Sequence, residues 1–380
     1  MGKRTPLLLL CLSVFLISLA PPMLCAVKKE KEKKEKKDKQ VSTVVLPVVF
    51  YMPETRWGVG GGGLLTYRPK AAPPDQRPSS LLFQAYYTQN KQYGIEISPE
   101  AYLKNETYIV QGYLKVSKFP DKFWGIGNNT PDLEEGLEDE DYLNYTPKIF
   151  NFELSVQRQI LKEQRLYAGV QLKYENFDIV EMAPLGLLVS GEVPGSTGGT
   201  LTSLGFLITW DTRDNIFYPF TGNLFQLNVD FYTPAFGSDF EFTTIKMDLR
   251  KYFTLFPSHV LAVQALLWNV SGEPTFRHLA EIGGEQIMRG YYTGRYRDHS
   301  MYALQAEYRV KVWKFIGMVA FAGVSNVADK IGNLGFDNIK YSVGLGLRFC
   351  VVPKERTNIR LDYGFGKGTS GMYITAREAF

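Results

Sequence analysis

Apolar and polar residues alternate with a period of two over most of the chain, and this pattern restricts the fold more than any other feature. The alternation recurs in segments 148–157, 165–174, 222–232, 242–252, 301–312 and 358–366. Successive side chains of a strand point to opposite faces of a sheet, so the pattern predicts an all-β protein. In segment 222–232 one face carries Phe225, Leu227, Val229 and Phe231, and the other carries Gln226, Asn228 and Asp230.

The length of these strands and the placement of their charges favour a barrel that spans a membrane. The segments run about 9–12 residues, which suits a tilted transmembrane strand. Charged side chains keep to one face over most of each strand. A membrane wall requires this, because a Lys or Arg that faces mid-bilayer lipid costs about 2–4 kcal/mol. We therefore predict a transmembrane antiparallel β-barrel. Alternation alone also fits a soluble β-sandwich or a lipocalin-like barrel.

The number of strands follows from their spacing. About fifteen strands are recognisable between residues 57 and 380 at the usual span length. A bacterial barrel with both ends on the periplasmic side needs an even number, so we predict sixteen strands, with fourteen as the alternative. We find no internal repeat, and we predict a single barrel domain with a long loop folded into its lumen.

The N-terminal region predicts export. Residues 1–26 combine a basic start, an apolar core and a terminal alanine, as a secretory signal peptide does. An uncleaved anchor helix is the alternative. Residues 27–46 are rich in lysine and glutamate with little to bury at their start, so we predict a charged periplasmic tether. Residues 47–380 remain for the barrel.

Charge and cysteine content exclude some classes of partner. The formal net charge is +4, and loss of the two positive charges of the signal peptide leaves +2, so nucleic acid is not an expected partner. Only Cys350 would remain in the mature chain, so it cannot form an internal disulfide.

The sequence predicts no cofactor and no metal site. Gly58, Gly60 and Gly63 imitate a dinucleotide-binding fingerprint, but a strand and a proline-rich segment follow where a helix is needed. The acidic segment 132–141 lacks the alternating ligand order of a calcium loop, so it reads as a solvated loop.

Enzymatic activity is not expected either. A barrel enzyme is one of three function classes that we considered, and it is the least favoured of them. Asp298, His299 and Ser300 are consecutive in the sequence. A catalytic triad is a spatial arrangement, so sequence neighbours do not define one. No catalytic residue is therefore predicted.

Several motifs together resemble a known family. They are "IMRGYY" at 287–292, "WDTRDNIFYPFTGN" at 210–223, "FYMPETRWGVGGGG" at 50–63 and "YITAREAF" at 373–380. Five predicted strands follow the first motif. The set is similar to the BamA/TamA superfamily of outer-membrane barrels, the bacterial surface antigen superfamily. The resemblance covers 47–380 and implies a multi-pass protein of a Gram-negative outer membrane.

The resemblance implies roles for particular residues. A long extracellular loop would fold into the barrel and place Arg289, followed by Gly290 and Tyr291, against an acidic wall residue. Strand parity points both Asp362 and Glu307 inward, and we expect Asp362 to meet Arg289 first. Phe321 stands where many relatives carry an aspartate, which removes one usual partner.

Two further sets of residues have expected roles. Asp, Gly and Pro cap and preset turns, so the periplasmic turn formed by Asp211, Arg213, Asp214, Pro219 and Gly222 has an expected structural role. The resemblance implies that the closing strand, which ends at Phe380, is the signal read by the barrel-assembly machinery.

The functional expectation has one main reading and one alternative. Segment 27–46 is too short for a POTRA domain, so none is expected in this chain. The resemblance then implies protein assembly or translocation, with separate periplasmic POTRA-bearing or chaperone proteins as partners beside outer-membrane lipids. A passive pore or surface antigen is the alternative.

Overall fold

The computed structural model describes residues 41–52, 56–69, 73, 76–130 and 138–380. The predicted signal peptide, residues 1–26, and the first part of the predicted tether lie outside the described residues. Among the helices within the described ranges, none is long and apolar enough to cross a membrane.

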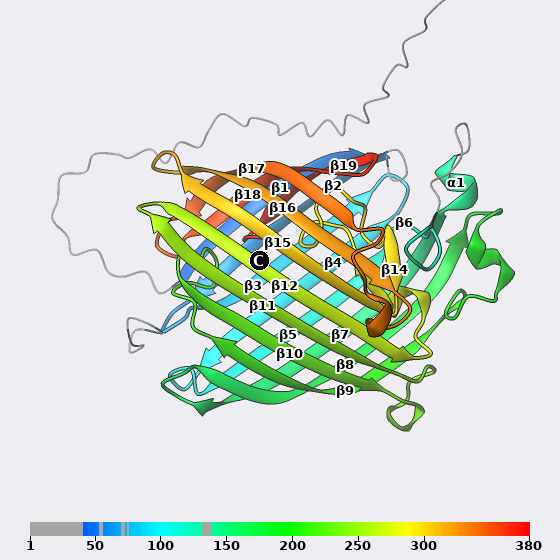
Figure 1. Ribbon diagram of the computed structural model, residues 1–380, viewed down its shortest axis with the longest axis horizontal. Helices are drawn as coiled ribbons and strands as arrows, with labels where there is room; N and C mark the ends of the chain where they lie inside the picture. The colour runs from blue at the N-terminus through cyan, green and yellow to red at the C-terminus, as the bar shows by residue number, and fades with distance from the viewer. Residues whose placement is uncertain (1–40, 53–55, 70–72, 74–75, 131–137) are drawn as a thin grey trace, which may run out of the picture.

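Strands dominate the described residues, and the helical elements are short (Figure 1). The strands of the large sheet are β1 (Val41–Met52), β2 (Arg56–Tyr67), β3 (Ser79–Thr88), β4 (Tyr93–Leu103), β5 (Tyr108–Lys118), β6 (Asp121–Lys122), β7 (Asn144–Leu161), β8 (Leu166–Met182), β9 (Gly198–Asp211), β10 (Gly222–Tyr232), β11 (Phe242–Phe256), β12 (His259–Gly272), β15 (Ser300–Lys311), β16 (Ile316–Ala328), β17 (Lys340–Val352), β18 (Thr357–Gly366) and β19 (Thr369–Ala376). The remaining elements are β13 (Ala280–Ile282), β14 (Tyr296–Asp298), α1 (Asp139–Tyr142), η1 (Leu187–Ser190), η2 (Pro234–Phe236), η3 (Phe276–His278) and η4 (Ile331–Asn333).

The large sheet is an antiparallel meander. Each long strand pairs with the next one in the sequence, with β5 pairing to β7 and β12 pairing to β15 across the intervening loop. The prediction of an all-β antiparallel barrel is confirmed. β1 lies near β17 (Figure 1). Within the described residues, no strand register pairs β1 with β19. The count of sixteen strands therefore stays a prediction.

The first strand begins earlier than the sequence indicated. β1 starts at Val41 and pairs with β2 from Val41 opposite Tyr67. Residues 41–46 of the predicted tether thus belong to the sheet. Their run of Val and Leu, with Thr, suits a strand once β2 is present to pair with it.

The two faces of the wall differ as the alternation predicts. On β15, Leu304 and Tyr308 are exposed at 45% and 37%, whereas Glu307 and Arg309 are fully buried on the inner side. The inner face carries the charges and amides, and the outer face carries aliphatic and aromatic side chains. Such segregation is what a strand with one lipid-facing side requires.

The connections between strands divide the barrel into two rims. The long-loop rim is formed by segments 119–130, 138–143, 183–197, 233–241 and 329–339. The short-turn rim is formed by segments 104–107, 162–165, 212–221, 257–258, 312–315 and 353–356. The segment between β12 and β15, residues 273–299, starts and ends on the long-loop rim.

Residues 273–299 fill the lumen, and we call them the lumenal loop. They contain the small β13–β14 hairpin. Ile282, Met288 and Tyr291 of the loop pack in one buried cluster with side chains from the wall, such as Phe177 and Leu266. Burial of these apolar side chains holds the loop inside, which agrees with the predicted fold.

The C-terminal residues turn into the barrel. β19 ends at Ala376, and Arg377 has φ of 72°, which breaks the strand. Phe380 is then buried against Tyr252 and Ala262 of the inner wall, and Figure 1 places the C-terminus within the barrel outline. The closing strand therefore ends at Ala376 and not at Phe380, where the sequence analysis placed its end.

Candidate functional site

The tip of the lumenal loop, residues 287–291, packs against the inner face of the last wall strands. Met288 N donates a hydrogen bond to Gln305 Oε1 of β15 at 2.8 Å. Ser342 Oγ of β17 donates to the carbonyl oxygen of Arg289. Two adjacent backbone groups of the tip are thus held by inward-facing side chains of different strands. These contacts fix where the Arg289 side chain begins.

Glycines allow the loop backbone to lie directly on β18. Gly290 has φ of 114°, which L side chains rarely adopt, and a Cβ there would lie 2.6 Å from the Phe365 carbonyl carbon. A Cβ on Gly364 would lie 2.6 Å from the Arg289 carbonyl carbon. Since real Cβ atoms do not approach so closely, both glycines are required for this packing.

The Arg289 side chain meets both predicted carboxylates. Its Nη1 lies 2.5 Å from Asp362 Oδ2, and its Nη2 donates to Glu307 Oε1. Arg289 is 1% exposed and both acids are fully buried. A guanidinium keeps its proton in proteins, so burial requires acceptors of this kind. Arg289 therefore engages Asp362 and Glu307 together, not Asp362 before Glu307.

The ring of Phe321 completes the Arg289 site. The guanidinium carbon lies 3.6 Å from the ring centroid, and this position on β16 is opposite Glu307 in the strand register. An aromatic face attracts a cation and adds about 0.5–2 kcal/mol, more where water is excluded. Phe321, which the sequence suggested as a lost partner, thus contacts Arg289 in a different way.

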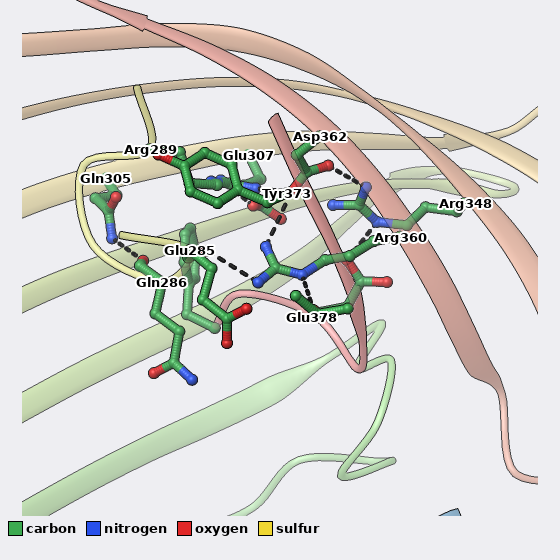
Figure 2. Close-up of polar contacts among 12 residues, drawn as sticks. Glu285, Gln286, Arg289, Gln305, Glu307, Arg348, Arg360, Asp362, Tyr373 and Glu378 are labelled. Carbon is green, nitrogen blue, oxygen red and sulfur yellow. Dashed lines mark hydrogen bonds and ion pairs between the residues drawn. The ribbon is translucent and has the colours of Figure 1, made fainter. Parts of the chain in front are cut away.

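A wider ion network surrounds this contact (Figure 2). Asp362 also accepts from Arg360 Nη1 at 2.9 Å and from Arg348 Nη1 at 2.5 Å. Arg348 Nε in turn lies 2.6 Å from Glu378 Oε2. Arg309 Nε donates to the second oxygen of Glu307 at 2.8 Å. Asp362 and Glu307 therefore each have more than one charged donor, as buried charges require.

Tyr291 anchors the far side of the tip. It is 1% exposed, and its hydroxyl accepts from Lys367 N at 2.9 Å. The Tyr291 carbonyl oxygen accepts from the Tyr373 hydroxyl of β19 at 3.1 Å, and the same hydroxyl accepts from Gly290 N at 3.0 Å. A Cβ on Gly366 would overlap the Tyr291 ring at 2.6 Å. Loop, β18 and β19 are thus joined at one place.

The predicted turn cluster lies on the short-turn rim, between β9 and β10. Asp211 accepts from Arg213 N at 3.1 Å and from Arg213 Nε at 2.9 Å. Asp214 Oδ1 accepts from the backbone of residues 220 and 221. Gly222 has φ of 101°, and buried Pro219 lies within the turn. These contacts give all five residues a place in the turn, as the sequence indicated.

The sequence did not indicate one further residue that contacts this turn. Arg77, just before β3, contributes its Nη1 to Asp211 at 2.7 Å and its Nε to Glu106 at 3.0 Å. It also donates to the Tyr167 hydroxyl at 2.9 Å and lies over the Tyr102 ring. Arg77 stands in an irregular segment without alternation, so strand parity gave no reason to select it.

A family comparison agrees with this arrangement. A model described as the Omp85 superfamily domain matches residues 77–373. The chain belongs to the Omp85 superfamily. The matched segment includes the whole lumenal loop and both of its carboxylate partners. The resemblance inferred from the motifs is thereby confirmed.

Solved structures show the same fold for this Omp85 chain. BamA from Haemophilus ducreyi lacking POTRA domains 1-3 is 13% identical with a TM-score of 0.55, and the match covers 89% of this chain and 69% of that one. CdiB from Acinetobacter baumannii is 11% identical with a TM-score of 0.51, and covers 89% and 60%. CdiB from Escherichia coli is 11% identical with a TM-score of 0.52, and covers 88% and 61%. The chain thus spans about three fifths of the CdiB chains. No curated protein matches the sequence.

The sites considered for catalysis and metal binding have other contacts in this Omp85 barrel. Ser300 Oγ donates to Asn269 Oδ1 at 2.8 Å, whereas His299 Nδ1 lies 3.5 Å from Asp298 Oδ1. The three residues are therefore not arranged as a relay. No group of His, Cys, Asp and Glu within the described ranges has the geometry of a metal site. The acidic segment 132–141 lies partly outside those ranges.

Proposed function

We propose that this chain is a multi-pass β-barrel of the outer membrane that takes part in protein assembly or translocation. The observation that carries the proposal is the lumenal loop of an Omp85 barrel, anchored through Arg289 to Asp362 and Glu307. This buried anchor, formed by Glu307 of β15, Asp362 of β18 and the Phe321 ring of β16, holds the loop across the lumen. The loop can therefore close the barrel while it remains attached at both of its ends.

The outward face of the wall supports the membrane placement. Large apolar side chains such as Val170, Phe206, Leu249 and Leu345, on β8, β9, β11 and β17, are exposed at 40–64%. Exposed apolar surface on this scale is costly in water and favourable in lipid. Outer-membrane lipids are thus the proposed surroundings of the wall.

The proposed partners follow from the family. Barrel-assembly machinery would insert the chain, and periplasmic POTRA-bearing or chaperone proteins would deliver substrates to it. We propose no catalytic step, because both carboxylates of the loop anchor are held in ion pairs with guanidinium groups.

Depletion of the protein in its host tests the proposal. The outer-membrane proteome should lose particular barrel or surface proteins, while inner-membrane proteins stay constant. Wild-type protein supplied in trans should restore them, and an Arg289→Ala variant should restore them less well. An unchanged outer-membrane proteome after complete depletion would contradict a role in assembly or translocation.

A passive pore is the second candidate, and the lumen contains an observation that favours it. Two polar cavities of about 370 and 240 Å³ lie along the inner wall, one lined by residues such as Lys173 and Asp230, the other by Gln226 and Arg250. Gln226 and Asn228, from successive inward positions of β10, line one cavity each. In planar bilayers, a pore should conduct steadily, and more so after deletion of the loop.

A further inference from the structure

A small cavity on the short-turn rim has an unusual lining. It has a volume of about 110 Å³ and lies among the turns that join β9–β10, β11–β12, β15–β16 and β17–β18. Its lining includes four cationic side chains, Lys311, Lys314, Arg348 and Arg356, and no carboxylate. The cavity is separate from the loop anchor, although Arg348 takes part in both.

The positive charges of the cavity are only partly balanced by neighbours. Arg356 pairs with Asp214 at 2.5 Å, and Arg348 pairs with Asp362 and Glu378 in the lumen. Lys311 and Lys314 are exposed and make no ion pair with a carboxylate in the part of the chain that the structure describes. Two positive charges are therefore left for a ligand.

Arg348 also keeps one nitrogen unused. The residue is 1% exposed, yet its Nη2 has no hydrogen-bond partner among the described residues. An unpaired buried donor is unfavourable, and more so when it is charged. Arg348 itself lines the cavity, so its charge adds to the positive lining that the two lysines provide.

Gly317 leaves room beside Arg348. The two residues face each other in the register of β16 and β17, and a Cβ on Gly317 would lie 3.3 Å from the Arg348 Cβ. Any larger residue at this position would crowd the Cβ and Cγ of Arg348. The glycine therefore keeps the inner end of the cavity open.

We propose that this cavity binds a phosphate group. Phosphate oxygens accept from guanidinium and ammonium donors in charge-assisted hydrogen bonds, which are about twice as strong as neutral ones. The volume exceeds the roughly 10–15 Å³ needed by one water but is too small for a nucleotide. The group belongs either to inorganic phosphate or to a phospholipid headgroup of the leaflet beside the short-turn rim.

Cys350 provides a reporter, because this residue lines the same cavity. In the full-length protein with Cys11→Ala and Cys25→Ala, Cys350 is the single thiol. The labelling rate with a neutral methanethiosulfonate reagent is measured in maltoside detergent with increasing inorganic phosphate. Phosphate should slow the labelling in a saturable way, since the bound anion fills the space beside the thiol.

Two variants test the site. Lys311→Gln combined with Lys314→Gln should weaken the apparent phosphate affinity by about tenfold or more, because it removes two charged donors. Gly317→Ala keeps every charge, and should also weaken binding by narrowing the cavity. Lys330→Gln, on the long-loop rim, is the matched control and should bind as the wild type does.

The source of the phosphate is decided by a second arm in phosphate-free buffer. Slow labelling in phospholipid nanodiscs but fast labelling in maltoside would identify the headgroup as the ligand. Fast labelling in both, with protection only after phosphate is added, would identify the free anion. The proposal is overturned if neither phosphate nor phospholipid slows labelling, or if the double lysine variant is protected as well as the wild type. None of these results depends on the proposed role in assembly.

Discussion

At the scale of single residues, one guanidinium holds the lumenal loop in place. Arg289 contributes two nitrogens to two carboxylates on different strands, and its flat face rests on Phe321. A lysine could supply the charge but not the planar fork or the same stacking. Loss of the positive charge and loss of the planar guanidinium should therefore have separate, measurable effects on how firmly the loop is held.

Arg289→Ala should release the loop tip. The change leaves Glu307 and Asp362 buried with fewer donors, and breaking a buried pair costs about 3–5 kcal/mol, less where lumenal water reaches it. Limited proteolysis of the loop in the purified barrel measures this, with Arg289→Lys as the control of intermediate effect. Equal loop protection in the wild type and the alanine variant would rule out the anchor.

Both carboxylates should couple to Arg289. Double-mutant cycles of Arg289→Ala with Asp362→Asn and with Glu307→Gln should each give a coupling energy of about 0.5–3 kcal/mol, as residues in contact do. Loop opening by hydrogen exchange supplies the four free energies of each cycle. If the Glu307 cycle gave zero while the Asp362 cycle did not, the shared contact described above would be incorrect.

At the scale of elements, the loop and β18 fit together through their backbones. Gly364 lies under Arg289, and Gly366 lies under the Tyr291 ring. Wall strands normally tolerate side chains on their inner face. Here the inner face of β18 is bare where the loop crosses it, so the strand and the loop have matching shapes.

Gly364→Ala should displace the loop without any change of charge. A Cβ there would lie 2.6 Å from backbone atoms of Arg289, so the loop tip must shift. Faster amide exchange at residues 287–291 is the expected readout. Gly332→Ala is the control, because a Cβ on Gly332 meets nothing within 4 Å. Unchanged exchange in Gly364→Ala would mean that the backbones are not in contact.

The rim end of the loop should respond to pH through His278. Burial lowers the pKa of His278, the charges of Arg277 and Lys173 lower it further, and Glu175 opposes them. Because the pKa is lowered in the folded state, the unfolded loop takes up a proton first as the pH falls below about 6.5. Docking of the loop should therefore weaken in that range, as measured by hydrogen exchange of residues 273–299.

A variant isolates the contribution of His278. Burial raises the pKa of Glu281 and of Glu285, and this acts in the opposite direction, because the folded loop then gains protons on acidification. The comparison of His278→Gln with the wild type cancels both glutamates. The variant should lose less docking stability than the wild type between pH 7 and 5, and an equal loss would contradict the role of His278.

At the scale of the whole molecule, the C-terminal segment joins the last strand to the inner wall. Phe380 is buried with Tyr252 and Ala262, and its carbonyl oxygen accepts from Arg309 Nη2 at 2.7 Å. The same residue is the proposed end of the assembly signal. The residue that is expected to end the assembly signal thus also packs in the interior of the barrel.

Deletion of Phe380 should reduce the membrane-inserted fraction. The C-terminal segment would lose an aromatic residue that assembly machinery is expected to read, and the inner wall would lose a buried ring. The inserted fraction and its heat-modifiable mobility on gels give two readouts. Phe349→Ala, an outward aromatic of β17 that is 40% exposed, is the control. If the deletion variant inserted normally but the barrel unfolded at a lower temperature on gels, Phe380 would contribute to packing and not to the assembly signal.

The sequence by itself determined which residues form the wall and which way they face. Leu304 and Glu307 fall on opposite sides of β15 because successive side chains of a strand alternate, and this property is local. The lumenal position of Arg289 and its two carboxylates followed from the same parity together with the family motif. The five wall strands after the motif, β15 to β19, were also found where they were expected.

Only the tertiary structure decided which inward residues meet. Phe321 lies under Arg289 because β15 and β16 pair in one register, and a shift of that register would bring another residue there. Arg348 joins Asp362 for the same reason across β17 and β18. Phe380 turns inward because Arg377 leaves the strand conformation, and its pocket forms only after β11 and β12 are assembled. Parity is a property of one strand, whereas these contacts need several strands at once.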